Sequence, residues 1–501
     1  MSDLAADHLD PAALAAADVN PRLYNEDLAP AKERTWRTYS LFAMWMSDIH
    51  SIGGYTFAAG LFAFGLVGWQ VLVALIIGIA LVNIGVNWMG SAGQKTGVCY
   101  PVLARASFGV YGSNIPALIR GIVAIAWYGI QTWLASVALI VLVLRVFPGL
   151  AGLAHGKFLG LSPLGWIAFL ALAALQLAIF SRGMESVRKL IDFAGPAIWV
   201  VMLALAAWVL VKSHGNITFN FSRTHASTGT VLHGFFASIS LTVAYFSTLM
   251  LNFCDFSRFA PSQRAVRRSN FWGLSVNFIA FSIVSVIVTG GSLAIYGKYI
   301  FDPVELVSRI NSSAAVLLGA ITFVVATVGI NVVANFVSPA YDLSNVAPKY
   351  ISFRRGGVIT AIISVAILPW YLYENPVAVD YFLGTLAAFL GPLFAIIMVD
   401  YYLIQHGQVT VRDLYRSAPG SRYLYRRGFN PLAIYAFVPS AAIAAVIALV
   451  PALATAAPFS WFIGAALGAG IYYPLSRRAG RNPARLSARP APPAAKPSTS
   501  L

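Results

Sequence analysis

Charged residues are scarce in this sequence, and their scarcity excludes an ordinary soluble domain. Only 10% of the 501 residues are Asp, Glu, Lys or Arg, whereas 58% are hydrophobic. A soluble globular domain carries about 25% charged residues. Apolar runs long enough to cross a bilayer as a helix recur along the whole chain. The short alternating segments of a transmembrane barrel are absent from the sequence. The composition therefore predicts an all-helical membrane protein.

Cysteine is also rare, since Cys99 and Cys254 are the only two. We expect both near the cytoplasmic face, where a disulfide is disfavoured. Two thiols are too few for a metal site, and no H-E-x-x-H zinc motif occurs. The stretch "GSAGQKTG" lacks the contiguous Gly-Lys-Thr of a phosphate-binding loop. These absences argue against ATP hydrolysis and metalloprotease chemistry, and we expect no cofactor and no resident metal.

Lys and Arg are unevenly distributed between the polar segments that separate about twelve expected membrane helices. With the N-terminus inside, the cytoplasmic segments hold 27 of these residues and the outer segments hold 6. The positive-inside rule then places both termini in the cytoplasm, and we expect the protein in the cytoplasmic (inner) membrane. The net charge of +16 follows from this topology, so nucleic acid is not an expected partner. The expected spans are 38–66, 68–90, 114–146, 162–181, 190–212, 230–252, 270–297, 313–337, 356–373, 380–404, 431–452 and 456–475.

Two of these spans contain polar stretches that indicate interrupted helices. The first span carries "SDIHSIGG" and the sixth carries "SISLTVAYFSTLMLN". They lie five helices apart, as in transporters built from inverted repeats with the substrate site at the breaks. For the sixth span, hydroxyls that bond the preceding turn are an equally good interpretation. The predicted organisation is a cytoplasmic N-terminal segment, two five-helix repeats, two extra helices and a disordered cytoplasmic tail, at 1–37, 38–212, 230–404, 431–475 and 476–501. Since no apolar segment opens the chain, we expect the first span to direct insertion.

Asp48 and His50 are ionisable residues inside the first span. Such groups are costly in the bilayer and usually face a cavity or a partner. If the helix unwinds around 48–54, either side chain could bind substrate or a proton. Alternatively, Asp48 caps the outer half-helix by accepting backbone N–H bonds.

Polar and aromatic side chains also recur at helical spacing in two other spans. Trp127 and Gln131 lie on one helix face, where a ring and a carboxamide can recognise a flat heterocycle, although interhelical packing is also common. Thr327, Asn331 and Asn335 follow at i, i+4 and i+8, which favours a lined cavity over a single interhelical hydrogen bond.

The chain resembles the nucleobase:cation symporter-1 family of hydantoin, allantoin, cytosine and uracil permeases. The resemblance runs over 21–475 and rests on several segments. These are "NPRLYNEDLAP", "YPVLARASFGVYGSNIPALIRGIVAIAWYGIQTW", "LNFCDFSRFA", "NVVANFVSPAYDLSNVAPKYISFRRGG" and "FLGPLFAIIMVDYYLI". It implies a LeuT-like fold of two inverted five-helix repeats plus two helices, with alternating access around one central site.

The resemblance also implies which residues bind the substrate. A flat molecule is expected between the aromatic of the third helix and that of the sixth, Trp127 and Phe246, next to Tyr245. The polar partners that the resemblance implies are Gln131, Asn331, Asn335 and His50.

The coupling ion is expected to be H⁺ or Na⁺, with H⁺ favoured. Sodium-coupled members use a Ser-Thr pair that corresponds here to Gly329 and Ile330, and Ile330 has no side-chain oxygen. Carbonyls of Met46, Ile49 and Ala326, and the Thr327 hydroxyl, are the remaining candidate sodium ligands. Proton coupling assigns the carrier role to Asp48 or His50.

The sequence thus predicts a secondary active importer, a cation symporter, of a small planar nitrogen heterocycle such as a nucleobase, hydantoin or allantoin. The expected partners are that small molecule and the lipid bilayer, and no oligomeric state is assigned. A channel or a membrane-embedded enzyme is the alternative. A channel needs a continuous polar lining, whereas the polar groups cluster at one depth. An enzyme needs a nucleophile–base pair, and only Asp48 and His50 are near each other in sequence.

Overall fold

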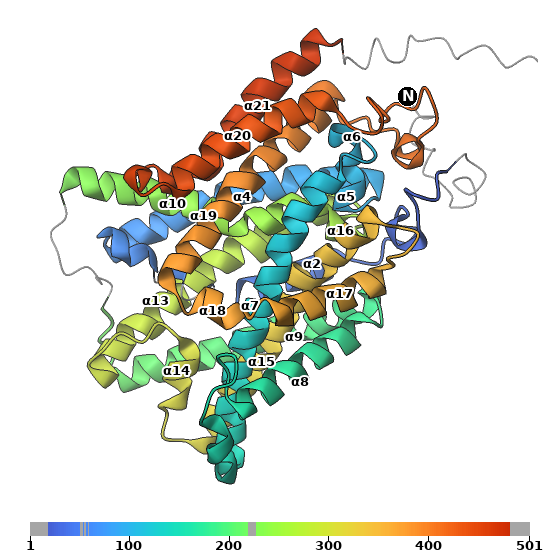
Figure 1. The fold of residues 1–501 in the computed structure, drawn as a ribbon. Coiled ribbons are helices and arrows are strands. Elements are labelled where there is room, and N and C mark those ends of the chain that lie inside the picture. The colour runs from blue at the N-terminus through green and yellow to red at the C-terminus, as the bar shows by residue number, and fades with distance from the viewer. Residues whose placement is uncertain (1–18, 51–53, 55–56, 59, 219–226, 481–501) are drawn as a thin grey trace, which may run out of the picture.

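The protein is a bundle of helices in the computed structural model, which describes residues 19–50, 54, 57–58, 60–218 and 227–480 (Figure 1). The longer α-helices are α2 (Thr38–Ile49), α4 (Gly68–Thr96), α7 (Asn114–Val146), α8 (Pro163–Phe180), α9 (Met184–Lys212), α10 (Thr228–Asn252), α13 (Asn277–Tyr296), α15 (Ser313–Ile330), α16 (Ser338–Val346), α17 (Phe353–Ala366), α19 (Pro376–Met398), α20 (Pro431–Leu449) and α21 (Ser460–Arg478). Short α-helices are α5 (Tyr100–Leu103), α6 (Arg105–Phe108), α11 (Cys254–Ser257), α12 (Gln263–Ser269), α14 (Pro303–Ser308) and α18 (Pro369–Tyr373). Three π-helical turns are η4 (Asn270–Val276), η5 (Asn331–Val337) and η6 (Val399–Ile404). The 3₁₀ turns are η1 (Glu26–Leu28), η2 (Leu61–Phe64), η3 (Pro148–Ala154), η7 (Val411–Tyr415), η8 (Pro451–Leu453) and η9 (Ala457–Phe459).

Nine helical segments within the described ranges are long and apolar enough to cross a membrane. They coincide with nine of the expected spans. The other three expected spans hold shorter or less apolar helices, namely α2, the α17–α18 pair and α21. The expected boundaries of the two repeats stay a prediction.

The first span does not form one membrane-length helix. Its helix α2 ends at Ile49 after 12 residues, a length of about 18 Å against the roughly 30 Å of the hydrocarbon layer. His50 follows with a non-helical backbone (φ −84°, ψ 51°). Asp48 therefore lies in the last turn of α2, and the interruption starts at His50 rather than at Asp48. Residues 51–53 of the predicted break, which spans 48–54, lie outside the described residues.

The predicted break within the sixth span is wrong, because α10 is continuous from Thr228 to Asn252. Three of its hydroxyls bond carbonyls of the preceding turn, whereas that of Ser240 donates to the Pro458 carbonyl. Ser238 donates to the Gly234 carbonyl and Thr242 to the Ser238 carbonyl, both over 2.8 Å. Ser247 likewise donates to the carbonyl of Ala244. These polar residues therefore satisfy themselves locally and do not open the helix.

The helices that carry the central cavity are packed together in the middle of the bundle (Figure 1). Helix α7 contacts α15, α16 and α8, whereas α2 packs against α9 and α10 packs against α4. At one edge, α20 and α21 lie side by side and cover α19 (Figure 1). The last two helices thus flank the bundle without entering its centre.

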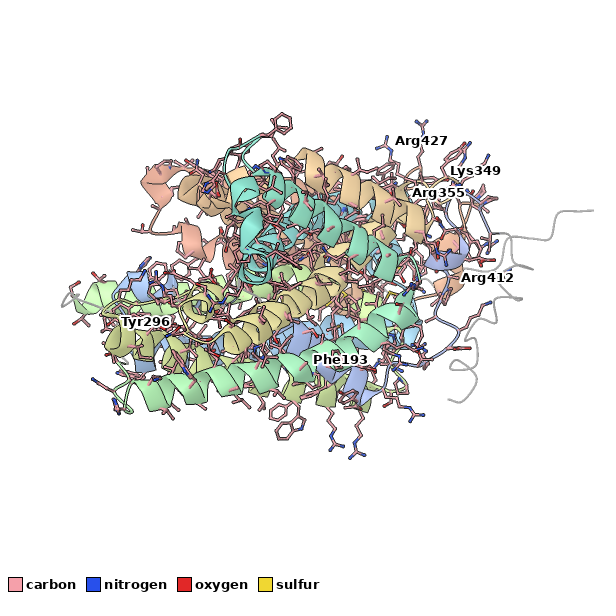
Figure 2. The ribbon with its side chains drawn as sticks, turned by 90° about the horizontal axis from the view of Figure 1, so that it is seen from below. Phe193, Tyr296, Lys349, Arg355, Arg412 and Arg427 are labelled. Carbon is pink, nitrogen blue, oxygen red and sulfur yellow. The ribbon has the colours of Figure 1, made fainter. Side chains whose placement is uncertain are left out.

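The surface of the bundle carries many exposed large apolar side chains, among them Ile122, Phe193 and Val200. Such a surface is expected to face lipid. Lys349, Arg355, Arg412 and Arg427 gather at one end of the molecule, and Tyr296 lies toward the other end (Figure 2). The basic residues therefore mark one of the two ends.

A buried ion pair links α7 to α16 in the interior of the bundle. Nη1 of Arg120 lies 3.5 Å from Oδ2 of Asp342, and both side chains are inaccessible to solvent. Nη2 of Arg120 donates to the carbonyl of Ala334 in η5. Asp342 lies past the expected end of the eighth span at residue 337, because the helix continues to Val346.

Replacing Asp342 by Ala should lower the free energy of unfolding by about 3–5 kcal/mol, because Arg120 is then buried without its counter-charge. The thermal midpoint of the purified protein in detergent measures this loss. The double variant Arg120→Met/Asp342→Leu should recover most of it, because neither charge remains. A single variant as stable as the unmodified protein would contradict the role of the pair.

Candidate functional site

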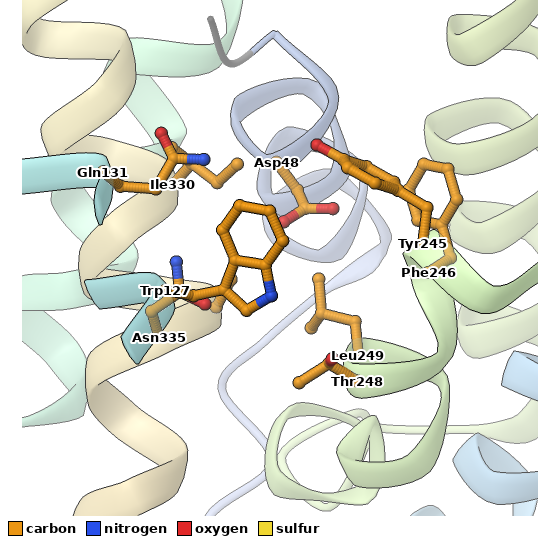
Figure 3. A pocket seen from close by; sticks show the side chains of 10 residues that line it. Asp48, Trp127, Gln131, Tyr245, Phe246, Thr248, Leu249, Ile330 and Asn335 are labelled. Carbon is orange, nitrogen blue, oxygen red and sulfur yellow. The ribbon is translucent and has the colours of Figure 1, made fainter. Parts of the chain in front are cut away.

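A cavity lies where α2, α7, α10, α15 and η5 meet. It is formed where α2 ends, so a helix terminus and three packed helices surround it. Figure 3 shows the Trp127 ring in the middle of the cavity, with Gln131 and Asn335 on one side and Asp48 and Tyr245 on the other. The lining residues are Asp48, Trp127, Gln131, Tyr245, Phe246, Thr248, Leu249, Ile330, Ala334 and Asn335.

Aromatic rings form opposite walls of this cavity. The centroids of Trp127 and Tyr245 lie 6.3 Å apart, with their planes at 77°. Tyr245 is stacked on Phe57 at 4.5 Å. Phe246 also lines the cavity, but its ring packs edge-on against Phe278. Of these two α10 rings, Tyr245 rather than Phe246 contacts Trp127, which also meets Phe382 of α19 at 5.7 Å.

Asp48 places a carboxyl group on the cavity wall from the last turn of α2. Its residue exposure is only 7%, and the carboxyl points toward the Trp127 ring (Figure 3). Within the described part of the chain, this group has no cationic partner. A buried carboxylate costs free energy unless a cation or a proton accompanies it.

Gln131 and Asn335 supply carboxamides to the same cavity. Gln131 lies one turn beyond Trp127 on α7, and its amide oxygen has no hydrogen-bond partner among the described residues. Asn335 lies on η5 and donates to Oδ1 of Asn331 over 3.1 Å. An amide can both donate and accept, so these two groups can replace hydrogen bonds that a polar guest loses on leaving water.

The structure places His50 outside the cavity lining. Its ring packs edge-on against Trp199 at 4.7 Å and against Phe281 at 5.1 Å, and it hydrogen-bonds to Asn277. Asp48 and His50 are two residues apart, so side chains at these positions do not share a helix face. His50 therefore fastens the end of α2 to α9 and α13, and its predicted contact with substrate has no support in this geometry.

Asn331 and Thr327 are also buried away from the cavity lining. Asn331 donates to groups of α7 and α8, and Thr327 is buried one turn before it on α15. Of the three polar residues expected to share one face, only Asn335 reaches the cavity. The π-helical turn that begins at Asn331 changes the helical spacing between them.

The residues considered for cation binding lie where α2 meets α15. Met46 and Ile49 belong to the last turn of α2, whose carbonyls lack partners within that helix. Ala326 is fully buried on α15. A Cβ atom on Gly329 would lie 3.9 Å from the Ser47 hydroxyl, and Ile330 turns its side chain to the cavity. The hydroxyls nearby belong to Ser47 and Thr327, and neither has a hydrogen-bond partner in the described residues.

The sequence did not identify Thr248, Leu249 and Ala334 as lining residues. Thr248 and Leu249 lie three and four residues from Tyr245 along α10, so their helical spacing from Tyr245 is a signal that could have identified them. Ala334 directly precedes Asn335 and carries no chemical signal of its own. The buried Asp342 had a signal as well, since Arg120 within a membrane span requires a partner.

The broken first helix, the apolar surface and the central polar cavity define a membrane transporter with its site between packed helices. A family model described as "Permease for cytosine/purines, uracil, thiamine, allantoin" matches residues 29–464. The chain belongs to this family of permeases, the nucleobase:cation symporter-1 family.

Individual relatives agree with this assignment. The chain is 37% identical to the allantoin permease of Bacillus subtilis (strain 168) over 462 residues, covering 91% of this chain and 94% of that protein. It is 34% identical to a purine-uracil permease of Arabidopsis thaliana, covering 86% and 72%. Among solved structures it resembles Mhp1, a nucleobase-cation-symport-1 family transporter in a closed conformation with bromovinylhydantoin bound. That likeness has a TM-score of 0.72 and 24% identity, with coverage of 92% and 97%. The fold is therefore LeuT-like, as predicted.

Replacing His50 by Ala should lower the thermal midpoint of the protein but change the KM of transport by less than about twofold, because the ring packs on α9 and α13. Uptake of radiolabelled allantoin, the substrate named for the Bacillus subtilis relative, measures KM. A KM that rises tenfold or more at normal stability would return His50 to the binding site.

Proposed function

We propose that this protein imports a small, flat, neutral nitrogen heterocycle, such as allantoin, a hydantoin or a nucleobase, by cation-coupled alternating access. The observation that carries the proposal is one cavity that joins an indole ring, two carboxamides and a carboxyl group. A heterocycle of this kind has two apolar faces and a polar rim. Rings can cover its faces while amides satisfy its rim, and few other small solutes need both.

In this proposal the substrate stacks on Trp127. A planar molecule between Trp127 and Tyr245 makes one aromatic contact with each ring, and each contact needs a centroid separation of about 4.5 Å or more. The present separation of 6.3 Å between the Trp127 and Tyr245 centroids is too small for both contacts. Tyr245 therefore turns from its edge-on orientation when substrate enters. Phe246 supports that movement from behind, and Gln131 and Asn335 bond the rim.

The proton is the proposed coupling ion, and Asp48 is its proposed carrier. Asp48 shares the cavity with the substrate and is buried without a cationic partner in the described residues. A proton bound there lowers the cost of burial and is transported together with the substrate. Gly329 and Ile330 supply no hydroxyl for sodium, which leaves main-chain carbonyls and the hydroxyls of Ser47 and Thr327.

We also propose that the protein lies in the cytoplasmic membrane with its basic end inside. Lys349, Arg355, Arg412 and Arg427 gather at that end (Figure 2). Positive charge next to a membrane span favours the cytoplasmic side. Both termini are then cytoplasmic.

Replacing Trp127 by Ala should weaken heterocycle binding about a hundredfold or more, because one whole stacking face is lost. The measurement is the ligand-induced rise of the thermal midpoint with allantoin, hydantoin and uracil. Trp133→Ala is the matched control, because Trp133 lies on the same helix but packs on Tyr373 away from the cavity. Undiminished binding by the Trp127 variant, or an equal loss in both variants, would move the site elsewhere.

Replacing Asp48 by Asn should uncouple uptake from the proton gradient, because the amide does not take up and release a proton in the same way. Exchange of labelled substrate should continue, whereas accumulation in vesicles should fall to the outside concentration. Asp192→Asn is the control, since Asp192 pairs with Arg188 near the N-terminal end of α9. If the Asp48 variant still accumulates substrate and a protonophore still abolishes this, Asp48 is not the carrier.

A further inference from the structure

A chain of buried amides connects the cavity to α8, a helix that contributes no residue to the cavity lining. Asn335, at the cavity, donates to Oδ1 of Asn331. Asn331 donates from Nδ2 to Oε1 of Gln176 over 2.8 Å and to the Thr132 hydroxyl over 2.9 Å. Gln176 is completely buried and belongs to α8. Gln176 has no role in the proposed binding of substrate or proton.

Two main-chain carbonyls determine which group donates and which accepts in each hydrogen bond of this row of amides. A carbonyl only accepts, and Gln176 directs Nε2 at the carbonyl of Leu172 over 3.2 Å. Its amide oxygen therefore faces Asn331. The second carbonyl, that of Tyr128, accepts from Asn331 over 3.0 Å and from the Thr132 hydroxyl over 2.8 Å.

These contacts leave Asn331 one stable orientation. Its nitrogen lies within hydrogen-bonding distance of three acceptors, on Tyr128, Thr132 and Gln176, which share its two N–H groups. A flipped amide would set its oxygen against the Tyr128 carbonyl and the Gln176 oxygen, which is repulsive because all of these groups are buried. The Asn331 oxygen is therefore turned toward Asn335 and requires a donor there.

The orientation of Asn335 follows from the same reasoning. Its nitrogen must face the Asn331 oxygen, so its own carbonyl oxygen is left for the cavity. Figure 3 shows this side chain beside the Trp127 ring. An amide oxygen held at this place accepts an N–H of the guest and rejects a guest that presents a carbonyl oxygen or an N-methyl group there.

We propose that Gln176 is a positioning residue for substrate recognition, which acts through Asn331 to hold the Asn335 carbonyl oxygen toward an N–H group of the transported heterocycle. The inference rests on the proposed function, because it names the chemical feature that the same cavity reads. The class of substrate is thereby narrowed to heterocycles with a free ring or ureide N–H on the edge that faces η5.

The test is a double-mutant cycle between Gln176→Met and Asn335→Ala, read as dissociation constants for hydantoin from ligand-induced thermal shifts. Methionine has a similar length and lacks the amide. Gln176→Met alone should weaken binding about fivefold to tenfold, the loss of about one hydrogen bond. In the Asn335→Ala background it should have no further effect, because Gln176 acts only through Asn335.

A ligand series adds a readout that general loosening of the helices does not change. The unmodified protein should bind hydantoin better than one of its two N-methyl derivatives, the one that places the methyl group at the Asn335 oxygen. Asn335→Ala should abolish this preference, and Gln176→Met should reduce it. Thr132→Val is the second variant, since it removes the hydroxyl that accepts from both Asn331 and Gln176.

The outcomes separate this inference from the proposed function. If the unmodified protein binds neither hydantoin, allantoin nor uracil, the proposed function fails. If it binds them but Gln176→Met and Thr132→Val weaken binding equally with and without Asn335, the two positions act independently and the positioning role is overturned. Unchanged affinity and unchanged N-methyl preference in both variants would overturn it as well.

Discussion

The hydrocarbon layer of a membrane offers no water to polar groups, so each of them has to find its partner within the protein. This constraint explains where the polar residues of the present chain lie. Several hydroxyls of α10 bond the preceding turn, Arg120 is paired with Asp342, and the amide of Asn331 lies against acceptors on α7 and α8. At the central cavity, the Gln131 amide oxygen has no hydrogen-bond partner and Asp48 has no cationic partner within the described part of the chain. These two groups are therefore available to a guest of the cavity.

The cavity combines an aromatic wall with a polar one that is fixed by hydrogen bonds. Tyr245 meets Trp127 edge-on and stacks on Phe57, and the proposed function requires its ring to turn when substrate enters. Asn335 is held by a chain of hydrogen bonds that ends on main-chain carbonyls of α7 and α8. Shape can thus adapt on one side while hydrogen-bond direction stays constant on the other, which suits a carrier that must bind and release the same molecule.

The fold and much of the cavity could be predicted from the sequence because lipid imposes simple rules. Apolar runs of about 20 residues give most of the helices, and the spacing of Trp127 and Gln131 placed both on one face. The packing of His50 on Trp199 and Phe281 could not be predicted, because both rings come from helices distant in sequence, and its contact with substrate stays a prediction. The partner of Arg120 depends on contacts between segments distant in sequence, whereas the continuity of α10 agrees with the local hydroxyl-to-carbonyl bonds that the sequence also allowed. Similarly, the direction of the Asn335 amide depends on Leu172 and Tyr128, whose carbonyls carry no sequence signal.

The edge-on contact between Tyr245 and Trp127 has a consequence for the tightness of the carrier. While these rings are 6.3 Å apart, the passage at the middle of the protein is narrower than a heterocycle stacked between them. In the proposed mechanism, substrate has to push the Tyr245 ring aside, so the ring that contacts the cargo also keeps the cavity narrow between transport cycles. A low rate of uncoupled ion leak between transport cycles would then depend on the size of the Tyr245 side chain.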